Sequence, residues 1–225
     1  MPKILVLVAG NNSPSNSETL ADAFMNGIKN VKGMETEKIK IHELTIKEFS
    51  IDFYDPQCSQ EEDFCRLQKL IEESNGVVFA TPIWNFSVPG HLKNLIDRMG
   101  SFALDASRTK GTLKGKPFYF IYSGGAPMVA WKALMHKTVS HMPESIRYFG
   151  GTPIDSSFEP KCTNGPGKFE LVVDKRPASL SIQRKHGEEF ARIVERYAKD
   201  GSLPAGKKLW NKLMSIGGTV LKKVG

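Results

Sequence analysis

The sequence predicts an α/β protein with a parallel β-sheet that carries helices on both of its faces. Short apolar runs rich in β-branched residues recur along the chain, as expected of strands that are buried on both faces. Stretches with apolar residues at helical spacing separate these runs almost throughout. Because parallel strands must be joined by such crossover connections, the alternation predicts a parallel sheet.

Several segments are expected to form strands. The runs KILVLVA, GVVFATP and PFYFIYS are almost wholly apolar, whereas EKIKIHE alternates as a half-buried strand does. In chain order, the expected strands are residues 3–9, 37–43, 76–82 and 117–123, with a short one near 148–154.

Helices are expected between these strands and after the last of them, at residues 18–30, 61–74, 88–99, 128–141 and 181–199. Residues 157–180 are interrupted by Pro and Gly, and we assign them no element. Gly201 and Pro204 break the last helix. We therefore divide the chain into a domain of residues 1–200 and a C-terminal tail of residues 201–225.

The composition is that of an ordinary globular protein, with 40% hydrophobic and 24% charged residues in a chain of 225. No apolar run reaches the roughly 18 residues that a membrane span needs. The apolar N-terminus passes at Gly10 into polar residues without a cleavage pattern, so we interpret it as a strand rather than a signal peptide. We expect a cytoplasmic protein.

The three cysteines (Cys58, Cys65 and Cys162) are too few and too scattered for a disulfide framework. Their spacing matches no zinc or iron–sulfur ligand set, so we expect reduced thiols and no metal.

The positive charge is concentrated in the tail. The tail carries five lysines and no acidic residue, and removing them from the net charge of +7 leaves +2 for residues 1–200. A nearly balanced body argues against nucleic-acid binding. The apolar residues of 207–224 recur at roughly helical spacing. This amphipathic segment either packs on its own domain or dimer partner or lies weakly on an anionic membrane surface.

Ligands of parallel sheets bind beyond the carboxyl ends of the strands, where the strand order reverses. Three loops are expected at that edge: residues 10–17, 82–88 and 123–127. The first loop joins a strand to a helix N-terminus, which suits a phosphate, and it is rich in Ser and Asn. It has neither GxGxxG nor a P-loop lysine. The same residues could instead only cap the helix.

The second loop and the helix after it carry a recognisable pattern. Residues 81–99, TPIWNFSVPGHLKNLIDRM, resemble the signature of the NADPH-dependent FMN reductase family in the flavodoxin-like superfamily. Ile83, Trp84 and Phe86 stand where that family usually has Glu, Tyr and Gly. Supporting features are the first loop, Lys114–Pro117, and Ser123–Gly125. The residues that match the family in order are Thr81, Pro82, Asn85, Ser87, Pro89, Leu92, Lys93, Asn94 and Asp97.

The resemblance implies a flavodoxin-like, doubly wound, five-stranded parallel sheet of order 2-1-3-4-5. It implies an FMN-dependent NAD(P)H oxidoreductase that passes hydride from NADPH or NADH through bound FMN to a flavin, a quinone or another small acceptor. The cofactor supplies the chemistry, so we nominate no catalytic side chain.

The resemblance also implies the cofactor-binding residues, which lie on all three loops. Trp84 and Phe86 have an alternative role as core or dimer-interface aromatics. The first loop lacks the Arg that many family members have there, which leaves hydroxyls, amides and the helix terminus to hold the phosphate. The expected residues are Asn11, Ser13, Ser15, Asn16, Ser17, Pro82, Ile83, Trp84, Asn85, Phe86, Ser87, Ser123, Gly124 and Gly125.

Residues 88–99 and the stretch after them, GSFALDASRTKG, resemble the family's dimer-forming segment. We therefore expect a homodimer or a dimer of dimers. Two other functions remain open: a non-enzymatic electron carrier of flavodoxin type, and a flavin-less interaction domain on the same fold. The basic charge counts against a carrier, because carriers tend to be acidic.

Overall fold

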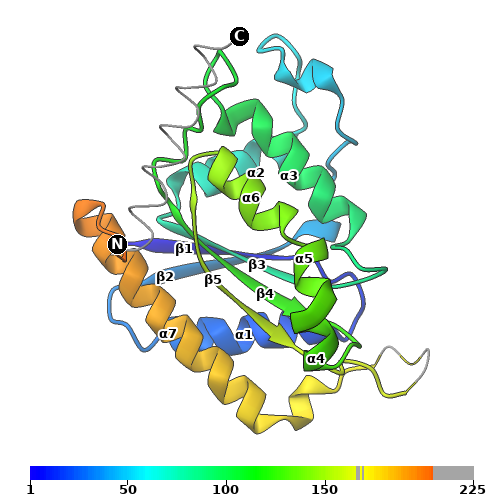
Figure 1. Cartoon of the computed structure of the whole chain (residues 1–225). Coiled ribbons are helices and arrows are strands. Elements are labelled where there is room, and N and C mark those ends of the chain that lie inside the picture. Colours follow the sequence, from blue (N-terminus) through cyan, green and yellow to red (C-terminus); the bar gives the residue numbers. More distant parts are fainter. Residues whose placement is uncertain (166–167, 169, 205–225) are drawn as a thin grey trace.

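The computed structural model describes residues 1–165, 168 and 170–204. Its five strands are all parallel and form one sheet in the order β2-β1-β3-β4-β5 (Figure 1). This confirms the predicted fold class and strand order. The predicted tail lies outside the described residues from position 205 onward. The strands are β1 (Lys3–Val8), β2 (Glu35–Lys40), β3 (Gly76–Pro82), β4 (Pro117–Ser123) and β5 (Thr152–Glu159).

The strand predictions succeed where the strand is buried. β3 and β4 are buried at every position, and the first and last residues predicted for each from its apolar run are those of the structure. The prediction for β5 was wrong in its bounds, because the strand lies at residues 152–159 rather than 148–154. This edge strand contains Asp155, Ser156 and Ser157, so it has no continuous apolar run from which its end could be read.

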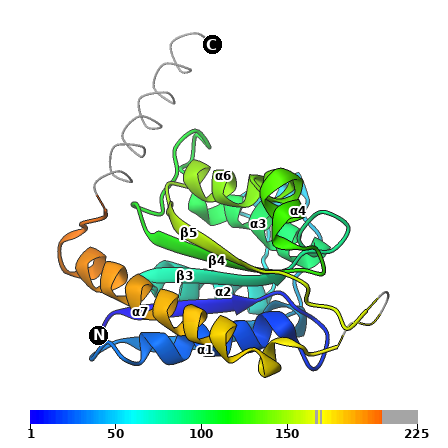
Figure 2. The ribbon, with the colours of Figure 1, turned by 60° about the horizontal axis from the view of Figure 1, so that its bottom comes forward.

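Helices cover both faces of the sheet (Figure 2). α1 (Asn16–Ile28) and α7 (Pro177–Asp200) share one apolar cluster with one face of the sheet. α2 (Glu62–Glu73), α3 (Gly90–Ala103) and α6 (His141–Tyr148) contribute to a second cluster on the opposite face. None of the described helices is both long and apolar enough to cross a bilayer.

The single helix expected at 128–141 is divided. It consists of α4 (Met128–Ala130), a π-helical turn (Trp131–Met135) and α5 (His136–Thr138), and α6 begins a new helix at His141. The π turn carries the buried Trp131, whose ring stacks on Phe158 of β5 at 4.2 Å between centroids. Helical periodicity alone cannot reveal a wider turn of this kind.

A buried arginine on α3 holds the segment that follows β2. Arg98 is fully buried and forms an ion pair with Glu61, at 2.6 Å between Nη2 and Oε2. It also donates to the carbonyl of Lys47 at 2.9 Å, and its guanidinium lies 3.5 Å from the centroid of the Phe53 ring. Burial raises the pKa of Glu61, but the hydrogen bonds from Arg98 and from the backbone outweigh it, so that the pKa lies below its usual value.

β3 leads into a tight turn at residues 84–87. Trp84 and Ser87 exchange two backbone hydrogen bonds, of 2.8 and 2.9 Å. The two central residues, Asn85 and Phe86, have φ values of 49° and 65°, as in a type I′ turn. Asn tolerates this left-handed region, whereas an aromatic residue is strained there. Phe86 is 59% exposed and stands where the resembled family has Gly.

We expect Arg98→Ala to lower the free energy of unfolding by about 3–5 kcal/mol, because it leaves the Glu61 carboxylate, whose side chain is only 10% exposed, without its cation. Urea denaturation measures this loss. The matched control is Lys93→Ala on the same helix, which removes an exposed pair with Asp97 and should cost about 0.5 kcal/mol or less. Equal losses in the two variants would contradict the role given to Arg98.

We expect Phe86→Gly to raise the free energy of unfolding by about 1 kcal/mol, because Gly adopts a positive φ without the strain of a side chain. Thermal unfolding measures the gain. Asn85→Gly should change stability less, since Asn already tolerates the conformation. A loss of stability in Phe86→Gly would mean instead that the ring makes stabilising contacts.

Candidate functional site

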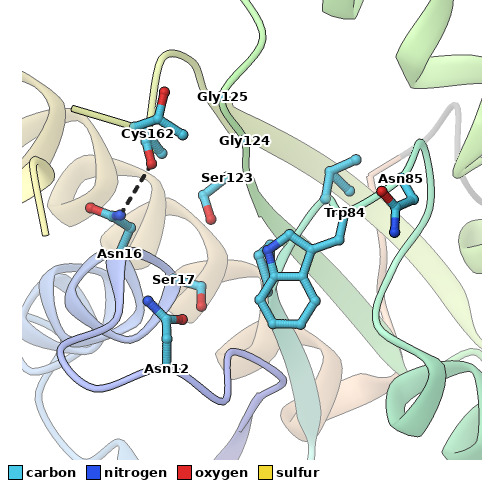
Figure 3. A pocket seen from close by; sticks show the side chains of 12 residues that line it. Asn12, Asn16, Ser17, Trp84, Asn85, Ser123, Gly124, Gly125 and Cys162 are labelled. Carbon is cyan, nitrogen blue, oxygen red and sulfur yellow. Dashed lines mark hydrogen bonds between the residues drawn. The ribbon is translucent and has the colours of Figure 1, made fainter. Parts of the chain in front are cut away.

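A cavity of about 520 Å³ lies beyond the carboxyl ends of β1, β3 and β4 (Figure 3). This volume is within the range of cavities that bind cofactors and other small molecules. All three predicted loops contribute to it, together with a fourth loop after β5. The lining residues are Asn12, Asn16, Ser17, Pro82, Ile83, Trp84, Asn85, Ser123, Gly124, Gly125, Cys162 and Thr163.

Most of the predicted site residues line this cavity, and five do not. Asn11 and Ser13 are exposed, and Ser15 is buried as the N-cap of α1. Phe86 points into solvent, and Ser87 closes the turn with Trp84. Three further residues line the cavity that were not among the residues predicted from the sequence: Asn12, Cys162 and Thr163.

One end of the cavity is the N-terminus of α1. The hydroxyl of Ser15 accepts a hydrogen bond from the N–H of Glu18 and lies 3.0 Å from the hydroxyl of Ser17. A Cβ on Gly10 would come within 2.5 Å of both hydroxyl oxygens, so only Gly lets the chain pass beside them. The sequence thus places neutral donors and the positive end of a helix dipole together.

The other end is apolar and comes from the second loop. The N–H of Ile83 donates to the carbonyl of Ser123 at 2.7 Å, which joins the second loop to the third. The indole of Trp84 lies along the cavity, and Asn85 lies at its rim (Figure 3). The N–H groups of Ile83, Trp84 and Gly124 all donate to backbone carbonyls. These three N–H groups are therefore not free to donate to a ligand, and a ligand would have to accept from other N–H groups of the loops.

The fourth loop, residues 160–172, was given no element by the sequence, and its residues Cys162 and Thr163 form a wall of the cavity. The N–H of Cys162 donates to the carbonyl of Gly124 at 2.9 Å. A Cβ on Gly125 would lie 3.1 Å from Thr163, so the glycine lets the third and fourth loops approach. Burial, with the neighbouring Glu159, raises the pKa of the Cys162 thiol to about 12, and the thiol is therefore neutral at pH 7.

None of the described residues that line the cavity carries a charged side chain. The helix terminus, hydroxyls and amides at one end suit a phosphomonoester, and the indole at the other end suits a flat aromatic ring. These residues therefore fit FMN. Among the described residues, no group of three His, Cys, Asp or Glu side chains is placed to hold a metal ion.

Comparison with known proteins agrees with this geometry. An FMN-dependent NADH:quinone oxidoreductase from Clostridium botulinum (strain Alaska E43) is 28% identical over 201 residues, covering 77% of this chain and 92% of that protein. An iron–sulfur flavoprotein from Archaeoglobus fulgidus is 27% identical over 142 residues. That match covers 62% of this chain and 60% of the length of the Archaeoglobus protein.

The fold is also that of solved reductases. The structure of an NAD(P)H:quinone oxidoreductase from Methanothermobacter marburgensis superimposes with a TM-score of 0.66 at 16% identity, covering 84% of this chain and 96% of that one. The family model of the NADPH-dependent FMN reductases matches residues 2–145. The predicted FMN, NAD(P)H and oxidoreductase class are thereby confirmed. The chain belongs to the NADPH-dependent FMN reductase family.

Proposed function

We propose that the 520 Å³ cavity is the FMN site and that the chain uses it to reduce a quinone-type acceptor with NAD(P)H. The observation that carries the proposal is the contrast between the two ends of the cavity. One end offers a helix N-terminus and hydroxyls, and the other offers the indole of Trp84 and the apolar side chains of Pro82 and Ile83. FMN has the same division between its phosphate and its tricyclic ring.

At the phosphate end, the proposed ligands are Ser17, Asn12 and the first-turn N–H groups of α1. The partial positive charge of the helix N-terminus favours a dianion there without help from a cationic side chain. Ser15 fixes the position of the proposed ligands, because its buried hydroxyl caps the helix and contacts the hydroxyl of Ser17. Asn11 and Ser13 are exposed, so we assign them no contact.

At the ring end, Pro82, Ile83 and Trp84 supply the surface and Asn85 supplies polar atoms at the rim. When bound, FMN supplies two-electron chemistry between the nicotinamide and the acceptor. The protein positions it: the hydrogen bond from Ile83 to Ser123 fixes the two loops that flank the ring. The backbone N–H groups of Asn85, Phe86 and Gly125, which make no backbone hydrogen bond to another described residue, are the proposed donors to the ring edge.

A quinone-type acceptor is supported by what the Clostridium and Methanothermobacter relatives reduce according to their names. Phe86, the chain neighbour of the rim residue Asn85, exposes 59% of its surface, and this apolar ring supports an apolar acceptor.

The visible spectrum of the purified protein, with anaerobic addition of NADH or NADPH, tests the function. We expect flavin bands, their bleaching by a nicotinamide, and recovery when a benzoquinone is added. If the protein takes up no added FMN, the reductase and the electron carrier are both excluded, and a flavin-less interaction domain is the function that fits. FMN that no nicotinamide reduces would indicate an electron carrier.

We further propose a homodimer formed through α3 and residues 100–111, and a cytoplasmic location. The resemblance of these segments to the family's dimer-forming segment supports the first. Sedimentation equilibrium tests it, and a monomer over the whole concentration range would exclude it. The membrane contact proposed for the tail depends on residues outside the described part. Liposome flotation with and without residues 202–225 tests that contact.

We expect Ser17→Ala and Asn85→Ala each to weaken FMN affinity about tenfold without unfolding the domain, because each removes a hydrogen bond to the cofactor worth about 1.5 kcal/mol. Fluorescence titration of the apoprotein with FMN measures the change. Ser181→Ala on α7 is the control, since Ser181 is exposed and lies outside both the cavity and the segment proposed to form the dimer. Unchanged affinity in both site variants would refute this assignment of ligands.

A further inference from the structure

We propose that Asn16 is a positioning residue rather than a cofactor ligand. Its side chain fixes the fourth loop as a wall of the cavity and thereby sets how long FMN remains bound. The proposal rests on the proposed function in one respect only, namely that FMN occupies this cavity. The contact between Asn16 and the fourth loop is a property of the protein without cofactor.

The side-chain amide of Asn16 bonds mainly to the fourth loop and the residue that follows it. Its Nδ2 donates to the carbonyls of Glu170, at 2.9 Å, and Cys162, at a longer 3.5 Å (Figure 3). Its Oδ1 accepts from the N–H groups of Val172, at 2.9 Å, and Val173, at 3.2 Å. An amide has two donor hydrogens and two acceptor lone pairs, so three of the four are engaged at 3.2 Å or less and only the hydrogen aimed at Cys162, at 3.5 Å, is weakly held.

Asn16 is only 8% exposed, and it follows the N-cap of α1 directly. Its amide therefore holds two segments against the helix end that carries Ser17. One is the start of the fourth loop, at Cys162, and the other is its end together with the next residue, at Glu170–Val173. Cys162 and Thr163 line the cavity together with Ser17. A change at Asn16 is thus transmitted to the wall while the hydroxyl of Ser17 stays in place.

The beginning of the fourth loop has anchors of its own. Arg176 donates to the Glu159 carboxylate at 2.7 Å and to the carbonyls of Pro160 and Lys161 at 2.7 and 2.8 Å. The N–H of Lys161 donates to the carbonyl of Ala126 at 3.1 Å. Removal of the Asn16 amide should therefore loosen the wall without detaching the loop.

A wall that is fixed before the cofactor arrives lowers the ordering cost of binding, and its loss should appear mainly as faster dissociation. The Cys162 thiol reports on the wall directly. It is 8% exposed and donates to the carbonyl of Glu159, at 3.3 Å between the heavy atoms. A loosened wall exposes this thiol and brings its pKa down toward the ordinary value, and both changes speed its reaction with a thiol reagent.

The first test uses the full-length apoprotein with Cys58→Ser and Cys65→Ser, so that only Cys162 reacts with Ellman's reagent. We expect Asn16→Ala to speed that reaction at least about tenfold. The matched control is Phe24→Leu on the same helix, which weakens the contacts of the Phe24 ring with Tyr119 of β4 and Phe190 of α7 and removes no hydrogen bond to the fourth loop. It should leave Cys162 protected. Equal protection in Asn16→Ala and in the parent would overturn the proposal.

The second test measures the rate of FMN release after dilution, by fluorescence. We expect Asn16→Ala to release FMN about tenfold faster, with association changed by less than about threefold. Faster release with Cys162 still protected would overturn the proposal and make Asn16 a direct ligand. If the parent protein binds no FMN, the proposed function fails, while the thiol experiment still decides whether Asn16 fixes the wall.

Asn16→Asp covers the case in which the alanine variant does not fold. The carboxylate still accepts from Val172 and Val173 but cannot donate to Glu170 or Cys162. We expect Cys162 in the apoprotein to react faster than in the parent, because the carboxylate oxygen that replaces Nδ2 repels the carbonyls of Glu170 and Cys162. Protection equal to that of the parent would overturn the proposal.

Discussion

The site depends on one constraint of the sheet: β1 and β3 are parallel neighbours whose following helices lie on opposite faces. The chain leaves β1 for α1 on one face, and it leaves β3 for α3 on the other. The first and second loops therefore diverge at the carboxyl edge and leave a crevice between them. The third loop, after β4, and the fourth, after β5, enclose that crevice because their strands continue the sheet on the same side.

The family signature in this chain serves the scaffold as much as the cavity. The side chain of Asn94 accepts from the N–H of Phe49 at 2.7 Å and donates to the carbonyl of Lys47 at 3.0 Å. Arg98, one turn later, binds the same carbonyl and Glu61. The helix that follows the second loop is thus held from its outer side by the segment after β2. A fixed helix in turn fixes the turn that presents Trp84.

The sequence predicted the parts of the fold that rest on burial, namely the buried strands and the amphipathic helices, and the family resemblance supplied the order of the sheet. It misplaced β5, an edge strand with polar residues, and it missed the π turn at Trp131, for which periodicity has no signal. Loops joined to predicted strands could be assigned to the site. Cys162 and Thr163 could not, because their position depends on contacts with Asn16 and Gly124 far away in sequence.

A cavity whose described lining carries no charged side chain is proposed to hold a phosphorylated flavin through a helix terminus and neutral donors. A crystal structure of the FMN complex tests it most directly. The account predicts phosphate density within hydrogen-bonding distance of the Ser17 hydroxyl and the first-turn N–H groups of α1, with the ring beside Trp84. A phosphate held by Lys or Arg elsewhere, with this cavity filled only by water, would contradict it.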